Sequence, residues 1–367
     1  MTLINYFSRV HFADGILEDA LHSEMERNQC TRPLVVFRDR YAGGTDFLDR
    51  LVSGFPYRSK IALHLITSGR VVKSDIKALN KAGAAHKADV LIAFGSTTAI
   101  AVAGLAEFRV AHRSDRNGAA KKMNSDQRAP LFFAIPGIEN LPAYGAAAQF
   151  PADPTHPYMA AGSQPDVIIC DPTVTMGETP ERTASAAITA MIRCIEAYVS
   201  DGFNPPADGI ALDGLIRTAQ NLHSTVDSDS LDGRRELMAA ALNGLLARQK
   251  GGGMVQSLTR AFAHEAGGQL DQGAISRLLL PAVLEFQGDV RKHDRYDQLK
   301  SVFSIPRHMS LPEGMQQFLA ELPLAQSLSK LGLGRSELKR TIRSAQMSWG
   351  IGVISEETLM PLLAPIQ

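Results

Sequence analysis

Short, uninterrupted apolar runs alternate with amphipathic segments in the first half of the chain. The runs predict strands at 33–37, 60–66, 89–94, 130–136 and 166–170. The segments between them predict helices at 46–51, 72–82 and 99–108. Strands buried on both faces carry continuous apolar residues, and crossover helices join such strands into a parallel sheet. We therefore expect residues 1–175 to form a doubly wound α/β domain.

The pattern changes after the Asp171-Pro172 dipeptide. Apolar residues then recur at helical spacing, and strand signals are nearly absent. The expected helices cover 180–199, 208–222, 231–247, 255–266, 274–286, 295–303, 314–322 and 336–347. We therefore expect residues 176–367 to form a second, all-helical domain. Two domains are also the expected number for 367 residues, because single cores stop growing near roughly 250–300 residues.

Composition narrows the class of protein. Thirty-eight basic residues balance 38 acidic ones, so no positive field attracts nucleic acid. The longest apolar stretches are far too short to span a bilayer, and the N-terminal residues lack the pattern of a secretory signal. Three widely spaced cysteines favour neither a disulfide framework nor a zinc site. We expect a soluble, cytoplasmic protein that binds neither nucleic acid nor membrane.

A candidate phosphate-binding turn follows the clearest strand. Gly95, Ser96, Thr97 and Thr98 stand between that strand and the next helix. Backbone N–H groups and hydroxyls at the positive end of a helix can hold a pyrophosphate. A turn capped for purely conformational reasons explains these four residues equally well.

Asp39 is a second candidate for cofactor binding. It follows the strand at 33–37, and acidic residues at such strand ends bind ribose hydroxyls in dinucleotide-binding folds. Because Arg38 and Arg40 flank it, an exposed loop aspartate is the alternative interpretation.

His264 is the candidate proton donor. It lies late in the helix expected at 255–266, one turn after Arg260 and on the same helix face. Imidazole titrates near neutral pH and can supply a proton. A structural histidine stabilised by the negative end of its helix is the alternative.

Several short motifs, taken in order, resemble one family. They are Pro165-Asp-Val-Ile-Ile-Cys-Asp-Pro172, Pro180, Thr183-Ala184, Ile195-Glu-Ala-Tyr198, Asn204-Pro205, Ala263-His264, Gly267-Gly268, Gly273 and Leu279-Leu280-Pro281. This series resembles the iron-containing alcohol dehydrogenase superfamily, which includes the maleylacetate reductases and is more distantly similar to dehydroquinate synthase. The resemblance implies a dinucleotide-binding α/β domain at 1–175, an all-helical metal and substrate domain at 176–367, NAD or NADP as cofactor, and a homodimer.

The functional motifs depart from the family's pattern. The glycine-rich phosphate loop is reduced to Gly95-Ser96-Thr97-Thr98, a form that looks most like the maleylacetate reductase version. In the second cofactor loop, two hydroxyls are missing and Glu139 is present. A carboxylate beside a pyrophosphate would weaken cofactor binding by charge repulsion.

The resemblance places the family's four metal ligands on residues that cannot serve as ligands. These residues are Thr189, Arg193, Arg260 and Gln272. Two of them are permanent cations, so we expect no metal. Arg193 and Arg260 could instead bind an anionic substrate and polarise its carbonyl group. The alternative is that both arginines fill a degenerate cleft and pair with Glu196 or Glu265.

Two functions follow, and the sequence leaves both open. The first is a metal-independent NAD(P)-linked oxidoreductase for a small, anionic carbonyl or alcohol substrate. In it, His264 gives the proton, Arg193 and Arg260 bind the substrate, and Gly95–Thr98 hold the cofactor. The second is a catalytically silent superfamily member that acts as a partner subunit, scaffold or regulator. A lyase or cyclase like dehydroquinate synthase is a weaker third, because that chemistry also uses a metal.

Overall fold

The chain divides into two compact units, Phe7–Thr175 and Met176–Gln367. The computed structural model describes residues 9–38, 45–69, 71–106, 130–137, 165–266, 270–288, 293–348 and 356–364.

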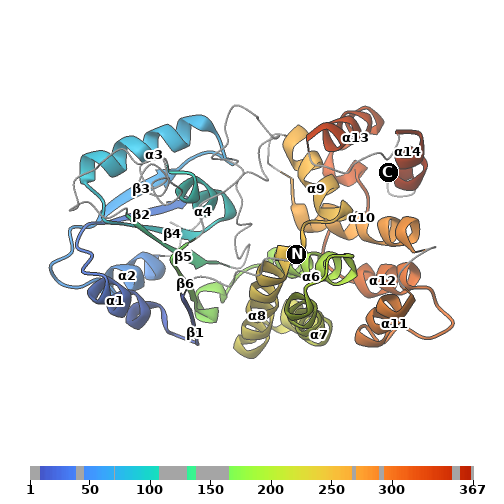
Figure 1. The fold of residues 1–367 in the computed structure, drawn as a ribbon, viewed down its shortest axis with the longest axis horizontal. Coiled ribbons are helices and arrows are strands. Elements are labelled where there is room, and N and C mark those ends of the chain that lie inside the picture. Colours follow the sequence, from blue (N-terminus) through green and yellow to red (C-terminus); the bar gives the residue numbers. More distant parts are fainter. Residues whose placement is uncertain are drawn as a thin grey trace. The chain divides into compact units, whose positions relative to one another are not determined.

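The N-terminal unit is a six-stranded parallel sheet with helices on both faces (Figure 1). Its elements are β1 (Arg9–Phe12), α1 (Leu17–Arg27), β2 (Pro33–Arg38), α2 (Thr45–Ser53), β3 (Ala62–Ile66), α3 (Lys73–His86), β4 (Val90–Gly95), α4 (Thr97–Gly104), β5 (Leu131–Pro136), β6 (Val167–Cys170) and the 3₁₀ turn η5 (Pro172–Thr175). The strand order is β1-β6-β5-β4-β2-β3. The predicted doubly wound α/β class is therefore confirmed.

Alternate residues of each central strand face opposite layers. In β2, Leu34 and Val36 pack with the helices α3 and α4, whereas Val35 and Phe37 pack with α1 and α2. All four side chains are buried, which explains why the sequence shows a continuous apolar run there. The edge strand β1 was not predicted, because its residues are only partly buried and its sequence, RVHF, is half polar.

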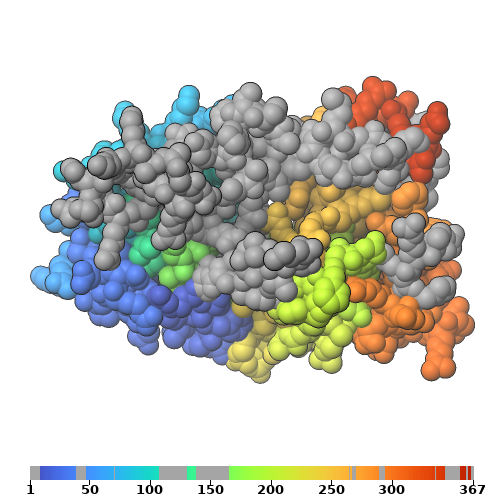
Figure 2. Space-filling view, viewed as in Figure 1, coloured from blue at the N-terminus to red at the C-terminus, as the bar shows by residue number. Residues whose placement is uncertain are grey.

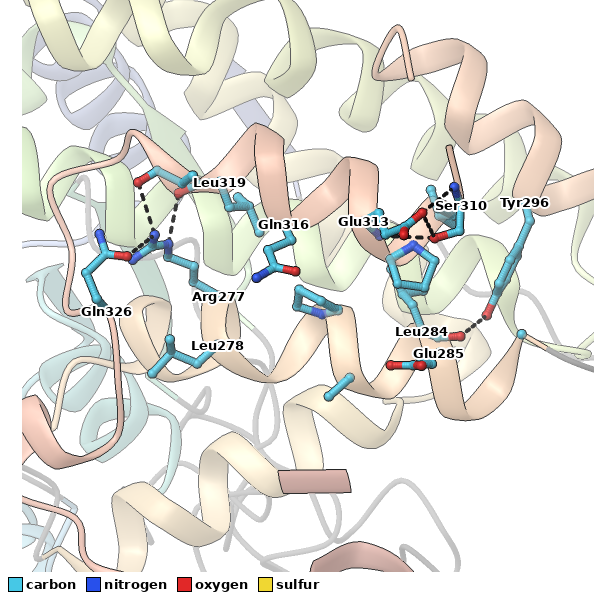
Figure 3. Close-up of a pocket in the computed structure, with 16 residues that line it drawn as sticks. Arg277, Leu278, Leu284, Glu285, Tyr296, Ser310, Glu313, Gln316, Leu319 and Gln326 are labelled. Atoms are coloured by element: carbon cyan, nitrogen blue, oxygen red, sulfur yellow. Dashed lines mark hydrogen bonds between the residues drawn. The ribbon is translucent and has the colours of Figure 1, made fainter. Parts of the chain in front are cut away.

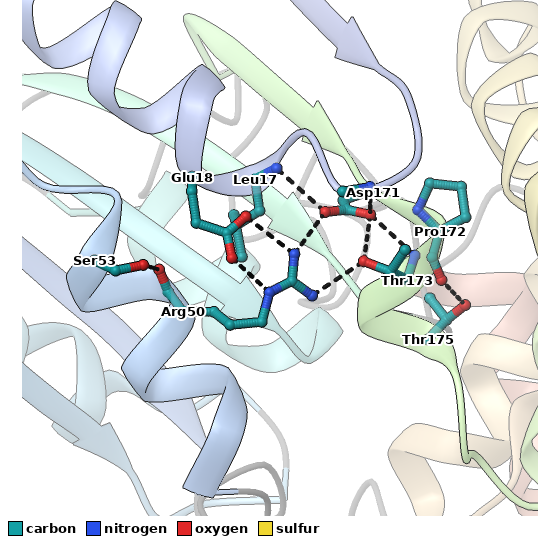
Figure 4. Close-up of polar contacts among 9 residues, drawn as sticks. Leu17, Glu18, Arg50, Ser53, Asp171, Pro172, Thr173 and Thr175 are labelled. Carbon is teal, nitrogen blue, oxygen red and sulfur yellow. Dashed lines mark hydrogen bonds and ion pairs between the residues drawn. The ribbon is translucent and has the colours of Figure 1, made fainter.

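A buried carboxylate ties β6 to α1 (Figure 4). Asp171, directly after β6, has no exposed surface. It accepts hydrogen bonds from the backbone N–H groups of Gly15 (2.8 Å) and Leu17 (3.1 Å), at the start of α1. It also accepts from the backbone N–H and the hydroxyl of Thr173 (2.9 and 2.6 Å). The aspartate of the Asp-Pro motif is thus a cap for a helix 154 residues away in the sequence.

Arg50 joins this cluster from α2. Its guanidinium donates to both oxygens of Glu18 (2.6 and 3.0 Å), to Asp171 (3.0 Å) and to the hydroxyl of Thr173 (3.0 Å). Two carboxylates surround one guanidinium, and the hydrogen bond to Glu18 raises the pKa of Arg50. The Asp171 cluster, formed by these four residues, fixes α1 and α2 against the end of β6.

The C-terminal unit consists of helices in its described residues (Figure 1). They are α6 (Pro180–Val199), α7 (Pro205–Ser228), α8 (Leu231–Ala247), η6 (Arg248–Lys250), α9 (Met254–Glu265), α10 (Gln272–Gln287), α11 (His293–Val302), α12 (Leu311–Ala320), η7 (Ser329–Leu331), α13 (Arg335–Ser348) and α14 (Glu356–Leu363). In the space-filling view, the orange part of this unit's surface belongs to the segment from α10 to α12 (Figure 2). No helix in the described part combines the length and the apolar character that a membrane span requires.

Local signals set the ends of these helices. Thr179, Asn204 and Ser230 each accept a hydrogen bond from the first turn of the helix that follows, and Pro180 and Pro205 stand at the first helical positions. Because Asn204 caps α7, this helix starts three residues earlier than predicted and extends to Ser228. Helix α14 was not predicted.

Helix α6 lies at the centre of the unit and packs against α7 and α8 through glycines. A Cβ atom at Gly214 of α7 would lie 2.7 Å from the sulfur of Cys194. A Cβ atom at Gly244 of α8 would lie 3.0 Å from the carbonyl oxygen of Ala190. The helices can approach this closely only because these positions carry no side chain.

Candidate functional site

The strand order of the N-terminal unit creates one topological switch point. The chain passes from β2 outward to β3, then returns to β4 on the other side of β2 and continues to β5. The connections that leave the carboxyl ends of β2 and β4 therefore run in opposite directions. Ligands of doubly wound sheets bind at this place.

The predicted phosphate turn lies at the carboxyl end of β4. Gly95 ends the strand with a φ of 76°, which a glycine adopts without strain. The buried Ser96 hydroxyl accepts from the backbone N–H of Ala99 (3.0 Å) and so caps α4. Thr98 is also buried and donates to the carbonyl oxygen of Gly69 (3.4 Å). Ser96 and Thr98 are thus buried, whereas Thr97, at the first position of α4, is partly exposed.

Asp39 and Glu139 lie outside the described residues. The strand before Asp39, β2, is the direct neighbour of β4 in the sheet. The sequence therefore assigned the two predicted parts of the cofactor site to segments that leave adjacent strands at the switch point.

Two of the residues predicted at the family's metal positions lie on α6. The Thr189 hydroxyl donates to the carbonyl oxygen of Ser185, one turn earlier in the same helix (2.9 Å). Arg193, one turn later, is 7% exposed. Burial and the positive charges of Arg248 and Arg260 lower its pKa to about 9. A guanidinium remains protonated in proteins. Arg193 therefore keeps its positive charge in surroundings that disfavour a positive charge.

Arg260 lies on α9 and is part-buried. Burial and the charge of Arg248 lower its pKa to about 10, and the carboxylate of Glu196 opposes this shift. The guanidinium donates to the side-chain oxygen of Gln256 (3.2 Å), and the amide of Gln256 donates in turn to Glu196 (2.7 Å). Gln256 therefore connects Arg260 to a buried carboxylate.

Glu196 does not have the role that the sequence suggested. Rather than pairing with an arginine, its buried carboxylate accepts from the backbone N–H groups of Gly253 (3.1 Å), Val255 (2.6 Å) and Gln256 (3.3 Å). It thus satisfies the N-terminus of α9. Glu265, the other suggested partner, lies 3.9 Å from Arg340.

Sequence reasoning missed Arg248 as a member of this site. Arg248 is the first residue of η6, and its charge acts on both Arg193 and Arg260. In the sequence it belongs to Arg248-Gln-Lys-Gly-Gly-Gly253, which has the composition of a helix end. A basic residue before a glycine run was the only local signal. We call Arg193, Arg248 and Arg260 the arginine cluster.

The last two predicted residues belong to α9 and α10. His264 lies one turn after Arg260 in α9, and its side chain is outside the described residues. Gln272 is the exposed first residue of α10. The preceding residue, Asp271, caps this helix by accepting from the backbone N–H of Ala274 (3.0 Å).

These residues do not fit a divalent cation. Such ions bind carboxylates, imidazoles or thiolates, whereas two of the four positions carry guanidinium groups that repel an ion. The hydroxyl of Thr189 is hydrogen-bonded within its own helix. In the part of the chain that the structure describes, no group of three or more His, Cys, Asp or Glu residues could hold a metal.

A separate cavity of about 570 Å³ lies between α10 and α12 (Figure 3). None of the predicted site residues lines it. At one end the buried guanidinium of Arg277 donates to five oxygens, those of Leu319 (2.9 Å), Ala320 (3.2 Å), Leu324 (3.1 Å), Ala325 (3.0 Å) and the Gln326 side chain (3.0 Å). Arg277 therefore stabilises the end of α12 through hydrogen bonds to oxygen atoms, and it is assigned to the fold.

Comparisons with known proteins agree with this architecture. Residues 183–351 match the model of the C-terminal part of the Fe-containing alcohol dehydrogenase family. Two reductases are among the solved structures that share the fold over the whole chain. A maleylacetate reductase from Agrobacterium tumefaciens has a TM-score of 0.73 at 19% identity and is covered to 98%. A sulfoacetaldehyde reductase from Bifidobacterium kashiwanohense, in complex with NAD+, has a TM-score of 0.79 at 15% identity and is also covered to 98%.

The C-terminal part of the chain thus matches the iron-containing alcohol dehydrogenase superfamily, the whole chain shares its fold, and the class of protein is that of the oxidoreductases. The resemblance seen in the sequence is confirmed. Among individual relatives, the chain is 28% identical to a 4-hydroxybutyrate dehydrogenase from Cupriavidus necator over 369 residues, which cover 94% of this chain and 93% of that protein. It is 33% identical to a 1,3-propanediol dehydrogenase from Citrobacter freundii over 124 residues, or 33% of this chain and 32% of that protein.

Proposed function

We propose that this protein is a metal-independent, NAD(P)-linked oxidoreductase for a small carbonyl or alcohol substrate that carries a negative charge. The observation that carries the proposal is the arginine cluster, which contains two of the positions expected for the family's metal ligands. Arg193 is buried, and Arg248 and Arg260 are half-buried. Guanidinium groups that repel one another in such a poorly solvated place favour binding of an anion, because the anion relieves that repulsion.

Within this proposal, Arg193 and Arg260 bind the substrate. Guanidinium groups form paired, charge-assisted hydrogen bonds to a carboxylate, and their charge also polarises a nearby carbonyl group. The side-chain oxygen of Gln256 accepts a hydrogen bond from the Arg260 guanidinium (3.2 Å). This bond orients the guanidinium before substrate binds.

His264 is the proposed proton donor to the substrate oxygen. It follows Arg260 by one helical turn on α9, so both residues share a helix face. The bound nicotinamide would donate or accept the hydride. In the reverse reaction, oxidation of the alcohol, the neutral imidazole accepts the proton from the substrate hydroxyl, since imidazole titrates near neutral pH.

The turn Gly95–Thr98 is the proposed pyrophosphate site, with Asp39 as partner of the ribose. The turn lies at the switch point of the sheet, where doubly wound folds bind ligands, and this position supports the assignment. The binding contribution is assigned to the backbone N–H groups at the start of α4 and to Thr97, because Thr97 is partly exposed whereas Ser96 and Thr98 are buried.

The names of relatives support an anionic substrate. The similar Cupriavidus enzyme is named for 4-hydroxybutyrate, a carboxylate, and one of the structural neighbours is named for sulfoacetaldehyde, a sulfonate. Both compounds join a reactive alcohol or aldehyde to a negatively charged group, which is the substrate class proposed here.

The test combines cofactor binding with turnover. Protein treated with EDTA is titrated calorimetrically with NADH and NADPH, and oxidation of 4-hydroxybutyrate is then followed with and without added Fe²⁺ or Zn²⁺. We expect micromolar cofactor binding and activity that added metal does not increase. Arg260→Gln is expected to lower kcat/KM about 100-fold, since one hydrogen bond to a charged group contributes roughly 1.5–3 kcal/mol.

Three outcomes would contradict parts of the proposal. Activity that appears only with added metal would disprove the proposal that the reaction needs no metal. Equal turnover of 1,3-propanediol and 4-hydroxybutyrate would disprove the preference for an anionic substrate. If millimolar NADH and NADPH produced neither heat nor a thermal shift, the oxidoreductase proposal would fall, and a catalytically silent partner subunit would take its place.

A further inference from the structure

The cavity between α10 and α12 is not used by the proposed function. Its volume of about 570 Å³ falls within the range of roughly 300–1,000 Å³ that is usual for pockets that hold small molecules. Its lining residues come from α10, α11, α12 and the residues next to them, so the whole cavity lies within the C-terminal unit. None of the proposed active-site residues is among them.

The cavity is elongated, because α10 and α12 run antiparallel along it. Arg277, in the first half of α10, donates to the carbonyl oxygens of Leu319 and Ala320 at the end of α12. Glu285 follows Arg277 by eight residues, or roughly 12 Å of α-helix. Glu313 lies near the start of α12. Figure 3 shows both glutamates at the end of the cavity opposite Arg277. The cavity therefore has one basic end and one acidic end.

The basic end offers little to an anion. A guanidinium has five N–H groups, and Arg277 makes five hydrogen bonds to oxygen atoms of the protein. Four of the acceptors are backbone carbonyl oxygens, and the fifth is the side chain of Gln326. An anionic ligand would have to replace one of these bonds and would also enter a cavity that two carboxylates line. The cavity thus disfavours anions.

The acidic end offers negatively charged acceptors. Glu285 is exposed, and its carboxylate has no hydrogen-bond or ion-pair partner within the described part of the chain. Glu313 accepts from the backbone N–H and the hydroxyl of Ser310 through Oε2 (2.9 and 2.7 Å). These hydrogen bonds lower the pKa of Glu313, so its carboxylate is ionised at neutral pH. Its other oxygen, Oε1, takes no part in this capping box.

Tyr296 adds a neutral acceptor at the same end. Its hydroxyl lies 3.5 Å from the carbonyl oxygen of Leu284, the residue before Glu285. Burial raises the pKa of Tyr296 to about 12, so the phenol stays uncharged and its oxygen can accept a further hydrogen bond. Its ring is also a surface that a cation can contact favourably.

The walls between the two ends are mainly apolar. They are formed by Leu278, Pro281, Leu284, Leu311, Pro312 and Leu319. Gln316 is the polar residue between the ends, and its side chain extends from α12 toward α10 (Figure 3). The apolar walls suit the hydrocarbon part of a ligand, whose transfer from water is favourable.

We propose that this cavity binds a small amphipathic ammonium compound, with the ammonium group at Glu285 and Glu313 and the apolar part between α10 and α12. An ammonium group has three donors and no acceptor, so it complements an end that is lined by carboxylate and phenol oxygens. A hydrocarbon part of up to roughly 12 Å matches the separation of Arg277 and Glu285. The inference does not depend on the proposed function, because the cavity and the proposed active site share no residue.

The test compares octylammonium, octanol and octanoate, which share a chain length and differ in the charge of the end group. Each is titrated calorimetrically into the full-length protein at the same low ionic strength. We expect octylammonium to bind at least about tenfold more tightly than octanol, since each of two partly exposed carboxylates contributes severalfold, and octanoate to bind most weakly. Glu285→Gln is expected to reduce the octylammonium-to-octanol ratio to less than about threefold.

Glu357→Gln is the matched control. Glu357 lies in the first turn of α14, is exposed and does not line the cavity, so its loss changes the net charge equally. The octylammonium-to-octanol ratio should stay at the wild-type value in this variant. A ratio that falls equally in both variants would show a general charge effect and overturn the proposal.

Ala282→Phe tests whether the ligand occupies the cavity itself. Ala282 lies on α10, is half-buried and lines the cavity, so a phenyl ring there takes up the space while both carboxylates remain. We expect octylammonium binding to be lost in a variant that thermal melting shows to be folded. Three results would disprove the cation site: unchanged octylammonium binding in folded Ala282→Phe, an unchanged ratio in Glu285→Gln, or octanoate binding as tightly as octylammonium to the wild-type protein.

Discussion

Each unit contains a cluster of charged residues around an arginine, and the two clusters differ in the charges that face this arginine. In the N-terminal unit, Arg50 is surrounded by Glu18, Asp171 and the hydroxyl of Thr173 (Figure 4). In the C-terminal unit, Arg193 has two other arginines as charged neighbours. The pKa of Arg50 is raised, whereas that of Arg193 is lowered.

This difference separates a structural role from a functional one. Opposite charges with good geometry stabilise the folded state, so Arg50 serves the packing of α1, α2 and β6. Like charges in a poorly solvated place reduce stability, and proteins keep such arrangements where a ligand needs them. The cluster of opposite charges is thus assigned to the fold, and the cluster of like charges has the binding role only within the function proposed above.

The largest expected effect is the loss of Asp171. Asp171→Ala removes the cap of α1, deprives Thr173 of its acceptor and removes one of the charges that face Arg50. We expect the free energy of unfolding to fall by roughly 3–5 kcal/mol, as for other broken buried ion pairs. Urea denaturation followed by circular dichroism measures this change.

Asp213→Ala is the control for this prediction. Asp213 is 50% exposed and pairs with Arg217 within α7, so its loss should cost less than about 1 kcal/mol. Equal losses in the two variants would mean that the Asp171 cluster stabilises the unit no more than a surface pair does.

The second expected effect has the opposite sign. Arg193→Met replaces a buried charge with an apolar side chain of similar length and removes its repulsion with Arg248 and Arg260. We expect the free energy of unfolding to rise by roughly 1 kcal/mol while turnover falls at least about 100-fold. Destabilisation by more than 1 kcal/mol would show that Arg193 is structural, as Arg50 is.

An uncharged case of similar size is Ser96. Ser96→Ala removes the hydroxyl that caps α4, and we expect a loss of about 1 kcal/mol in thermal or urea unfolding. Thr97→Ala, at the partly exposed next position, should instead weaken NADH binding with little change in stability. The opposite pattern would assign the cofactor contact to Ser96.

The smallest expected effect concerns acid stability. The hydrogen bond from Arg50 lowers the pKa of Glu18 from its ordinary value of 4.5. The stabilisation is therefore complete above pH 4.5 and is lost as the pH falls through the lower pKa of the folded state. Because Glu18 is 30% exposed, we expect less than about 1 kcal/mol. Glu18→Gln should flatten the curve of stability against pH below 4.5, and an unchanged curve would refute this contribution.

Most of the fold could be predicted because its signals are local. The apolar run 89–94 corresponds to β4 (Val90–Gly95), and the run 166–170 to β6 (Val167–Cys170). The strand β1 carries no such run, because an edge strand is buried only in part. Helix α7 was predicted too short, since its first turn depends on the cap Asn204 and on Pro205.

The candidate site could be predicted only in part. Arg193 and Arg260 were found through their positions in the family resemblance, but neither Arg248 nor Gln256 has a motif of its own. Their roles depend on the packing of η6 and α9 against α6, which no local pattern reveals. The role of Glu196 was mistaken for the same reason, since its partners are backbone N–H groups about 60 residues away.

The sequence by itself determined the class of this protein: a doubly wound sheet followed by helices, with the motifs of the iron-containing alcohol dehydrogenase superfamily. These properties rest on hydrophobic period and on motif order, which are local along the chain. The tertiary structure decided which charges meet. It surrounded Arg50 with carboxylates and brought Arg248 to Arg193 and Arg260, because electrostatic interactions depend on distance and burial in space and not on separation in sequence.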